Sequence, residues 1–282
     1  MARPQPLFTR GLFDALDQPD PPMRAMTLAS GSSGNATYVH AGNTRLLVDA
    51  GIEKKHIAAA LETHGASIDQ LDAVIVTHAH GDHIGGLRAV VNQSRAIVMA
   101  SRPVLRSARR LCKTDLSARS SELRPGWKTA VGCIEITPVR TSHDAPGSLG
   151  VMLSAGGRRL AVLTDLGCVD DATRQLIRAC DVAILEANFD VQMLEQGPYP
   201  PYLKRRVAGD RGHLSNDDAA ALIATSASSR LQRVICAHLS QENNLPELAL
   251  RALQSAVDGV QHLRHVHVSV APRREPSELF HV

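Results

Sequence analysis

The sequence is poor in cysteine and in aromatic residues, and it contains no long apolar run. Its five cysteines are odd in number, scattered and without a Cys-x-x-Cys pair. This pattern fits reduced thiols in a core better than a disulfide framework or a structural zinc site. No stretch approaches the roughly 20 apolar residues that a membrane-spanning helix needs, and the first residues lack the basic-then-apolar pattern of an export signal. These absences predict a cytoplasmic protein that does not enter a membrane.

The chain does contain enough apolar sequence for one large α/β domain. Of its 282 residues, 44% are hydrophobic, and neither an internal repeat nor a low-complexity linker divides it. We expect a loose N-terminal extension at residues 1–22, a single domain at residues 23–272 and a C-terminal tail at residues 273–282. The net charge of +3 permits nucleic-acid binding without arguing for it.

Apolar runs separated by Gly-rich turns predict two strand-rich halves, each with helices. The expected strands are Arg24–Ala29, Thr37–His40, Thr44–Val48, Ala73–Thr77, Ile134–Val139, Leu149–Ser154, Leu160–Thr164, Val182–Glu186, Arg233–Ala237 and Val266–Val270. The expected helices are Lys54–His64, Asp170–Ala179, Asn216–Ala227 and Pro246–Val257. Ser215 with Asp218 resembles a capping box, and Asn244 is a plausible N-cap. Such halves can pack as a four-layer αββα sandwich, although the pattern alone leaves other architectures open.

The densest group of metal-binding side chains directly follows the predicted strand that ends at Thr77, and it reads His78-Ala79-His80-Gly81-Asp82-His83. A helix would point residues i and i+2 about 200° apart, so these donors must converge from a loop, which the small Ala79 and Gly81 leave room to fold. In an extended segment His78 and His80 point to the same side, and Asp82 and His83 can aim elsewhere. This geometry suits two ions side by side.

Three further donors close later strands: His143 in Ser142-His143-Asp144, Asp165 in Thr164-Asp165-Leu166, and His238 in Ala237-His238-Leu239. Each alone would be an ordinary turn residue, but with the loop they make seven donors. A catalytic zinc takes about three protein ligands plus water. Seven donors therefore indicate two ions, roughly 3.5–4 Å apart, that share a carboxylate, and a hydroxide bridging them would be the nucleophile.

His-x-His-x-Asp-His after a strand, followed by His, Asp and His at later strand ends, resembles the motif series of the metallo-β-lactamase superfamily over about residues 24–270. The resemblance implies the αββα sandwich, with metals in a groove at one edge. It assigns one metal to His78, His80 and His143, and the other to Asp82, His83 and His238. It makes Asp165 the bridge between the two. Asp49, at the end of Thr44–Val48, matches the first motif and would fix the ligand loop from behind.

Longer motifs resemble the YycJ/WalJ-like subfamily. They are Leu28-Ala29-Ser30-Gly31-Ser32-Ser33-Gly34-Asn35, Ser142-His143-Asp144-Ala145, Thr164-Asp165-Leu166-Gly167, Leu185-Glu186-Ala187-Asn188, Gly197-Pro198-Tyr199-Pro200, Gly212-His213-Leu214-Ser215-Asn216 and His238-Leu239-Ser240 followed by Asn243-Asn244-Leu245-Pro246. That subfamily is associated with 5′-to-3′ exonuclease activity on DNA, so the resemblance implies phosphodiester hydrolysis. Phe189 departs from it, since similar proteins often carry a histidine there.

Two further features of the sequence distinguish this chain from the zinc β-lactamases and from the larger β-CASP nucleases. Zinc β-lactamases commonly place a cysteine where this chain has Asp165, and Cys168 comes three residues too late and is expected to pack in the core. Asp165 and His238 are 73 positions apart, and that stretch already contains predicted strand and helix. It has no room for the β-CASP insert of the larger nucleases, so we expect a bare sandwich.

Beside the metal ligand Asp82, Glu186 and His213 are the other candidate catalytic residues. They resemble the Glu and His of tRNase Z-like nucleases, in which the His meets the scissile phosphate and the Glu orients it. A protonated His213 would stabilise the transition state or protonate the leaving oxygen; the alternative is a histidine that caps a turn. Ser32, Ser33 and Asn35 would cradle a phosphate, or they form a tight turn between strands.

Basic residues offer a further set of candidate DNA contacts. One row has the spacing of a helix face and comprises Arg102, Arg106, Arg109, Arg110 and Lys113. A second, Lys204-Arg205-Arg206, follows Tyr199 and Tyr202, which would stack on an unpaired base. Each row could follow a phosphate backbone or be a solvated face.

Three functions remain open from the sequence. The leading one is a DNA exonuclease that uses two divalent ions. The second is an ester, thioester or lactone hydrolase that uses the same ions, and the third is a binding module that keeps only the fold. Basic charge around the groove favours the first over the second, and a full ligand set disfavours the third. The donor types suit Zn²⁺ first, with Mn²⁺ or Fe²⁺ as alternatives.

Overall fold

Two seven-stranded sheets form the centre of the part of the chain that the computed structural model describes, residues 21–113, 116 and 119–282. Sheet A contains, in spatial order, β14 (Phe280–His281), β1 (Met23–Ala29), β2 (Ala36–Ala41), β3 (Thr44–Val48), β4 (Ala73–Ile75), β5 (Ile97–Ala100) and β6 (Ser120–Glu122). Sheet B contains β13 (His267–Val270), β12 (Arg233–Ala237), β11 (Val182–Glu186), β10 (Arg158–Leu163), β9 (Leu149–Ala155), β8 (Ile134–Arg140) and β7 (Thr129–Val131).

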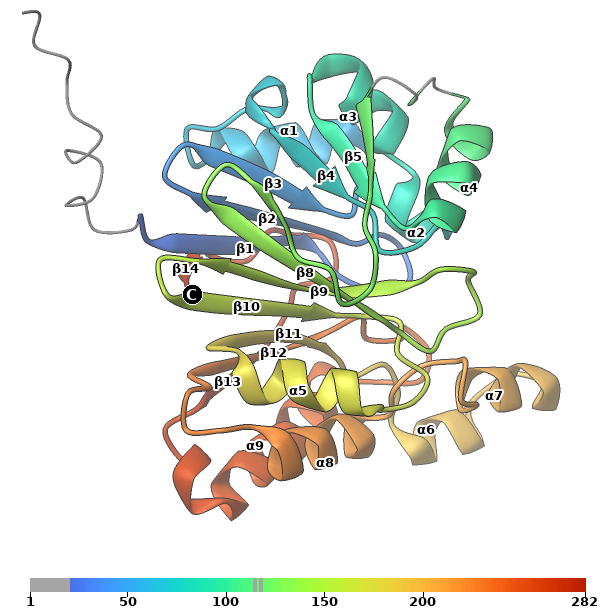
Figure 1. Cartoon of the computed structure of the whole chain (residues 1–282). Coiled ribbons are helices and arrows are strands. Elements are labelled where there is room, and N and C mark those ends of the chain that lie inside the picture. The colour runs from blue at the N-terminus through green and yellow to red at the C-terminus, as the bar shows by residue number, and fades with distance from the viewer. Residues whose placement is uncertain (1–20, 114–115, 117–118) are drawn as a thin grey trace, which may run out of the picture.

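The helices cover the outer faces of the two sheets. The first half of the chain supplies α1 (Lys54–Glu62), α2 (Gly81–Ile84), α3 (Leu87–Gln93) and α4 (Arg102–Cys112). The second half supplies α5 (Asp171–Ala179), α6 (Val191–Gln196), α7 (Pro201–Val207), α8 (Asn216–Ser226) and α9 (Pro246–Gly259). Figure 1 shows α1 and α3 above sheet A and α5, α8 and α9 below sheet B. The chain therefore has the four-layer αββα sandwich that the sequence predicts.

Strand β11 illustrates why the central strands read as continuous apolar runs. Val182 and Ile184 face the core between the two sheets, whereas Ala183 and Leu185 face the core between sheet B and its helices. Side chains alternate between the faces of a strand, and a parallel strand covered on both sides must be apolar on both. Burial on both faces thus fixes β11 in the centre of sheet B, and Glu186 at its end is the first polar residue.

Parallel strands bring the candidate ligands to one end of the sandwich. Strands β3, β4 and β5 are parallel, as are β10, β11 and β12. Asp49 follows β3 and the motif beginning at His78 follows β4, while Asp165 and His238 follow β10 and β12. Because the carboxyl ends of parallel strands meet at one sheet edge, residues far apart in sequence become neighbours there.

The predicted strands and helices agree with the structure within two residues at each end, but several elements were not predicted. Strand β4 ends at Ile75 and not at Thr77, and β5, β6, β7, β14 and helices α2, α3, α6 and α7 are additions. The expected tail at residues 273–282 is wrong, because Phe280 is buried and pairs with Ala25 in sheet A. Of the expected extension at residues 1–22, all but the last two residues lie outside the described part of the chain.

The two capping predictions had opposite outcomes. Ser215 caps α8, because its Oγ accepts a hydrogen bond from the backbone N–H of Asp218 at 3.0 Å. The prediction for Asn244 is wrong: Leu245 is the N-cap of α9 and makes no side-chain cap bond. The Asn244 amide is buried and donates to the carbonyl of Ala187 at 2.8 Å. A hydrogen bond to a residue distant in the sequence therefore replaces the helix cap that we predicted for this side chain.

The cysteine prediction is correct for two residues and wrong for two others. Cys180 and Cys236 are buried, and burial raises the pKa of both thiols to about 12, so they are unreactive core residues. Cys168 is only half-buried and Cys133 is exposed. The side chain of Cys112 lies outside the described residues.

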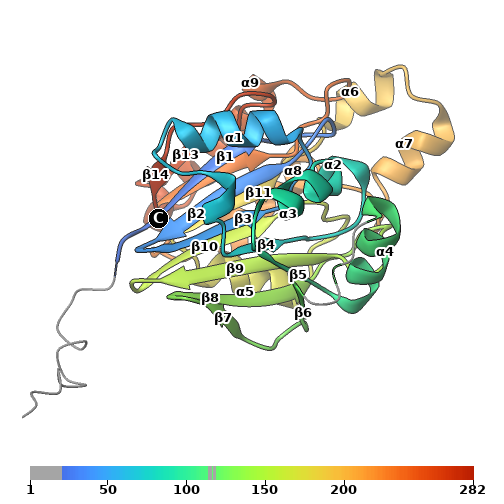
Figure 2. The ribbon, with the colours of Figure 1, turned by 90° about the horizontal axis from the view of Figure 1, so that it is seen from above.

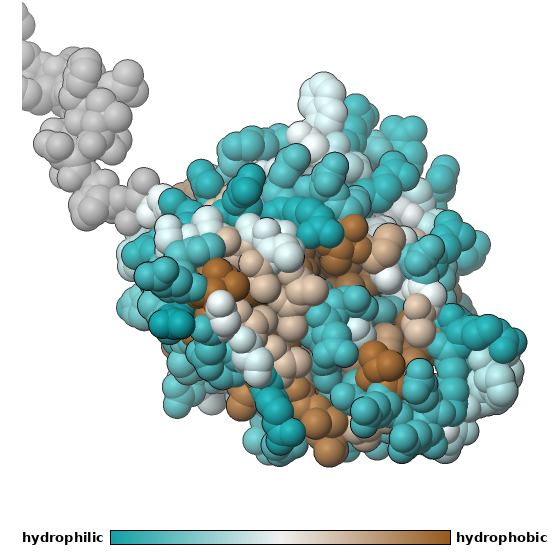
Figure 3. Space-filling view, turned by 90° about the horizontal axis from the view of Figure 1, so that it is seen from below, coloured by the Kyte–Doolittle hydropathy of each residue, from teal (hydrophilic) through white to brown (hydrophobic). Residues whose placement is uncertain are grey.

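The outer helices have the polar faces expected of a helix layer. In α5, Leu176 and Ile177 are buried while Arg174 and Arg178 are exposed. Figure 3 shows the molecule from below, with hydrophilic residues dominating the rim and smaller apolar patches toward the middle. In the described part of the chain, no helix combines the length and the apolar composition needed to cross a membrane.

The loop after β3 packs backbone against backbone on the segment that carries the ligands. Ala50 donates a hydrogen bond to the carbonyl of His83 at 2.9 Å, and the N–H of Asn35 donates to the carbonyl of Asp82 at 2.7 Å. A Cβ atom at Gly51 would overlap the Asp82 carbonyl and lie 2.7 Å from the backbone nitrogen of Asn35. The glycine that permits this packing is therefore Gly51, which the sequence did not single out.

We expect Gly51→Ala to lower the free energy of unfolding by about 1–3 kcal/mol, because rigid backbone atoms must move apart. For a chain of this size the melting temperature should fall by roughly 2–10 °C. Gly81→Ala is the matched control, since a Cβ there meets no atom within 4 Å, and the expectation that Gly81 makes room for the loop is wrong. Thermal melts of both variants in the presence of a chelator test this; equal melting temperatures would contradict it.

Candidate metal centre

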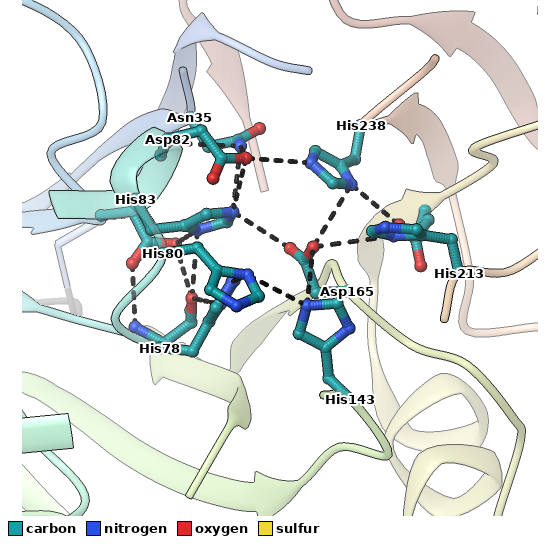
Figure 4. Close-up of polar contacts among 12 residues, drawn as sticks. Asn35, His78, His80, Asp82, His83, His143, Asp165, His213 and His238 are labelled. Carbon is teal, nitrogen blue, oxygen red and sulfur yellow. Dashed lines mark hydrogen bonds and ion pairs between the residues drawn. The ribbon is translucent and has the colours of Figure 1, made fainter. Parts of the chain in front are cut away.

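The first group of donors comprises three histidine nitrogens at the open edge of the sandwich (Figure 4). His80 Nδ1 lies 3.2 Å from His78 Nε2 and 3.3 Å from His143 Nε2. Tetrahedral ligands at Zn–N distances of 2.0–2.1 Å would be about 3.3 Å apart. The three nitrogens are therefore spaced as ligands of one ion. His78, His80 and His143 together lie close enough to one another to hold a metal ion.

The second group lies beside the first and uses the short helix α2. Asp82 Oδ2 lies 3.5 Å from His83 Nε2 and 3.4 Å from His238 Nε2. Here the expectation that all four motif donors come from a loop is only half right, because Asp82 and His83 occupy α2 while His78 and His80 precede it. The helical turn directs the second pair to a different point from the first, as two separate ions require.

Asp165 lies between the two groups and faces both. Its Oδ2 is 3.1 Å from His83 Nε2, and its Oδ1 is 3.6 Å from His143 Nε2. Oδ2 is buried and makes no well-aligned hydrogen bond among the described residues, although His83 Nε2 lies beside it. A buried carboxylate oxygen needs a compensating partner, and a cation would provide one. The donor set thus fits two divalent ions with Asp165 between them.

The negative charge around the ring nitrogens supports the same conclusion. Burial would lower the pKa of His83, but Asp49 and Asp165 beside it raise that pKa well above its ordinary value. His238 behaves alike: burial opposes the charged form, yet Asp165 and Asp82 raise its pKa to about 10. The carboxylates therefore impose negative charge on these ring nitrogens, and divalent ions would balance it.

Hydrogen bonds behind the ligands fix which nitrogen faces the ions. Asp49 accepts from the backbone N–H of Thr77 and from His83 Nδ1, each at 2.8 Å. His143 Nδ1 donates to the carbonyl of Gly212 at 3.0 Å. With Nδ1 occupied in both rings, Nε2 is the nitrogen that faces the other donors of the centre. Asp49 is therefore placed as its motif implied, behind the ligand loop.

Three residues that form or support the metal centre share an unusual backbone conformation. Asp49, Asp165 and His238 have positive φ angles of 61°, 58° and 55°. This left-handed region costs a residue with a side chain roughly 1 kcal/mol or more. Each residue comes just after a strand, and the tight turn aims its side chain back toward the centre. The fold thus holds local strain where the candidate ligands converge.

Glu186 and His213 are in contact, but Glu186 also has a second partner. Glu186 Oε1 lies 2.8 Å from His213 Nδ1 and 2.8 Å from His238 Nδ1. Its Oε2 accepts from the backbone N–H groups of Leu166 and Leu214 at 2.7 and 3.1 Å. The charge and hydrogen bond of His213, together with the hydrogen bond of His238, hold the pKa of the fully buried Glu186 at about 2, against the effect of burial. Glu186 is therefore positioned to orient two histidines rather than to touch a substrate.

The residues expected to contact substrate are more widely spread. Tyr199 and Ser32 line one cavity next to the centre. Ser33, Tyr202 and Arg205 are exposed, while the Lys204 ammonium donates to the carbonyl of Glu195. Asn35 is buried, and its amide group bonds to both the backbone N–H and the carbonyl of Gly31. These residues do not form one surface, and Asn35 supports the loop from inside.

Sequence reasoning gave no role to Ser30 and Asn188, which hold the backbone of His238, or to the carboxylate of Asp144. Ser30 Oγ accepts a hydrogen bond from the backbone N–H of His238 at 2.8 Å, and the Asn188 amide donates to the carbonyl of His238 at 2.7 Å. Asp144 Oδ1 lies 3.4 Å from both His80 Nε2 and His143 Nε2. The adjacency of Asp144 to His143 in the sequence was the only signal for this third acidic group at the mouth.

Comparison with known proteins agrees with the fold and the site. A family model described as "Beta-lactamase superfamily domain" matches residues 44–238. The sandwich, the paired donor groups and this match define a metal-dependent hydrolase of that superfamily. The chain is 33% identical over 231 residues to exodeoxyribonuclease YycJ of Bacillus anthracis, and the match covers 82% of this chain and 88% of the relative. It is 34% identical over 225 residues to exodeoxyribonuclease WalJ of Streptococcus pneumoniae, covering 79% and 83%.

The chain therefore belongs to the YycJ/WalJ family of the metallo-β-lactamase superfamily. Solved structures share the same fold at low sequence identity. The metallo-β-lactamase fold protein YhfI of Bacillus subtilis superimposes with a TM-score of 0.68 at 14% identity, over 93% of this chain and all of that one.

Proposed function

We propose that this enzyme is an exodeoxyribonuclease that hydrolyses the phosphodiester bonds of DNA from the 5′ end. The observation that carries the proposal is the similarity, over about four fifths of the chain, to two proteins named as exodeoxyribonucleases. The geometry of the metal centre supports phosphodiester hydrolysis through three features: the donor set, the contact between His213 and Glu186, and the basic residues around the groove.

The chain's own donors would hold two divalent ions, with His78, His80 and His143 around one, Asp82, His83 and His238 around the other, and Asp165 between them. When bound, such ions lower the pKa of water and polarise the bond under attack. Zn²⁺ is our first choice because histidine nitrogens dominate the set, while Mn²⁺ or Fe²⁺ also suits nitrogen and carboxylate ligands.

His213 is the residue that would act on the leaving group. Burial lowers its pKa, but the carboxylate of Glu186, at 2.8 Å, raises it above the ordinary value. The carboxylate of Glu186 therefore favours the protonated form of the ring. Because Nδ1 is bonded to Glu186, Nε2 is the atom left to donate a proton to the departing oxygen of the cleaved phosphodiester.

Two basic helices at one end of the sandwich favour DNA over a small neutral ester. Helix α4 carries the exposed Arg102, Arg106, Arg109 and Arg110, and α7 carries the exposed Arg205 and Arg206. Figures 1 and 2 both place α4 and α7 at the same end of the sandwich. Neither helix contains an acidic residue. Positive charge on both helices would attract a phosphate backbone and hold it across the metals.

The test is hydrolysis of linear, 5′-phosphorylated DNA by purified protein with Zn²⁺ or Mn²⁺, beside a panel of thioesters and lactones. We expect release of mononucleotides from the DNA, loss of that activity with a chelator, and a steep fall as salt rises. Turnover of a thioester or lactone with no DNA cleavage under any metal condition would reject the proposal and identify a small-molecule hydrolase.

A further inference from the structure

A cavity of about 150 Å³ opens beside the metal centre, and the mechanism above leaves it without a role. Its walls come from helix α7 and from the loops after β1, β8, β11, α7 and β12, and they include Ser32, Asp144, Tyr199, Arg206, His213 and Ser240. A cavity of this volume holds a group about as large as a single small ring. It therefore has room for one phosphate group but not for a continuing strand.

The cavity is rich in hydrogen-bond donors. The hydroxyl groups of Ser32 and Tyr199 and the guanidinium of Arg206 all lie on its walls. Arg206 binds Asp144 through Nε at 2.8 Å and through Nη2 at 2.6 Å. A guanidinium has five N–H donors, so three remain for a second anion. Arginine presented in this way matches the oxygens of a phosphate.

The same ion pair connects the cavity to the metal centre. The other oxygen of Asp144 lies 3.4 Å from nitrogens of His80 and His143, and Arg206 offsets the negative charge that Asp144 would otherwise present to an incoming anion. On the other wall, His213 Nδ1 lies 3.7 Å from Asp165 Oδ1. A phosphate in the cavity would thus be the immediate neighbour of the phosphodiester at the metals.

We propose that this cavity binds the 5′-terminal phosphate of a DNA strand, with Arg206 as its anchor, and so confines cleavage to the end of the strand. The proposal rests on the exonuclease function proposed above and adds the group that the enzyme recognises. Because the cavity holds only one phosphate, a strand whose 5′ end is not free cannot place an internal bond at the metals.

The experiment compares duplexes of one sequence that end in a 5′-phosphate or a 5′-hydroxyl, together with a circular single strand. For the unaltered enzyme, KM for the 5′-phosphate should be about 10-fold lower or more, the usual worth of hydrogen bonds to a charged group. Arg206→Gln should lose this preference, and Arg206→Lys should keep part of it because the charge remains. The control is Arg251, an exposed residue on the outer helix α9 that does not line the cavity. Arg251→Gln should retain the full preference.

Each outcome bears on one proposal. Equal KM values for the two ends, or cleavage of the circle as fast as the linear strand, would overturn the phosphate cavity and leave the nuclease function standing. Loss of bound metal in Arg206→Gln would also overturn it, since Arg206 would then act through Asp144 on the ligands. No cleavage of any DNA by the unaltered enzyme would instead reject the function on which the cavity depends.

Discussion

Replacing Asp82 by alanine is expected to lower kcat/KM for DNA hydrolysis by about 10³-fold or more. Asp82 is the carboxylate of the second donor group, with its Oδ2 within 3.5 Å of both His83 Nε2 and His238 Nε2. Without it, this group retains only two histidines and the shared Asp165, and bound metal should fall from two ions per chain to one. A metal ion supplies several kcal/mol of transition-state stabilisation, which corresponds to this loss in rate.

The fold should survive the change, because Asp82 is fixed mainly by its backbone. Its carbonyl accepts from the N–H of Asn35 at 2.7 Å, a bond that alanine keeps. Asp258→Ala, an exposed aspartate on α9, is the matched control and should keep both ions and full activity. Metal analysis, melting temperature and kinetics are measured together. A variant that is inactive but still binds two ions would contradict the assignment of Asp82 as a ligand.

The second large effect is expected for His213→Ala, which should reduce kcat for phosphodiester cleavage by roughly 10²–10⁴, the usual contribution of a general acid. Metal content should not change, because none of the seven proposed ligands is altered and Nδ1 of His213 is bonded to Glu186. Glu186 keeps its contacts with His238, Leu166 and Leu214 in this variant. The folded structure should therefore persist while the proton donor is lost.

His56→Ala provides the control for His213→Ala, since His56 is an exposed histidine on α1, over the opposite sheet. It should behave as the unaltered protein in kinetics and in metal content. If His213→Ala keeps full activity on DNA, His213 only caps its turn and the proposed acid is wrong. If it loses an ion, His213 is an eighth ligand and the hydrogen-bond network with Glu186 has been misassigned.

The positions of the candidate ligands could be predicted because they follow from short-range pattern and one topological fact. His78, Asp165 and His238 each come just after an apolar run that is long enough to be recognised as a strand. Parallel strands then bring such ends to a common edge. The resemblance to the metallo-β-lactamase superfamily supplied the pairing of donors into two groups. Which nitrogen of each ring faces the centre depended on partners from elsewhere in the chain.

What escaped prediction depends on contacts between distant segments. Asn244 has the sequence position of a helix cap, but carbonyl groups 56 and 57 residues away take its amide. Glu186 resembles the partner of one histidine, and only the assembled edge shows that it holds two. Arg206 lies in a basic run that could equally be a solvated face, and its role depends on Asp144, 62 residues away. No local pattern encodes such separations.

The backbone packing around Gly51 determines what would be needed to move this metal site to another protein. The carbonyl of Asp82 is held by the loop at Asn35, and the carbonyl of His83 by the loop at Ala50. Neither bond involves a side chain, so neither can be restored by choosing different residues in the six-residue motif. Transplanting His78 to His83 into a different sandwich should yield the ligands without their geometry. The smallest transferable unit for this motif is three segments together, residues 31–35, 49–52 and 77–86, grafted as one piece, while His143, Asp165 and His238 would still have to come from the second sheet.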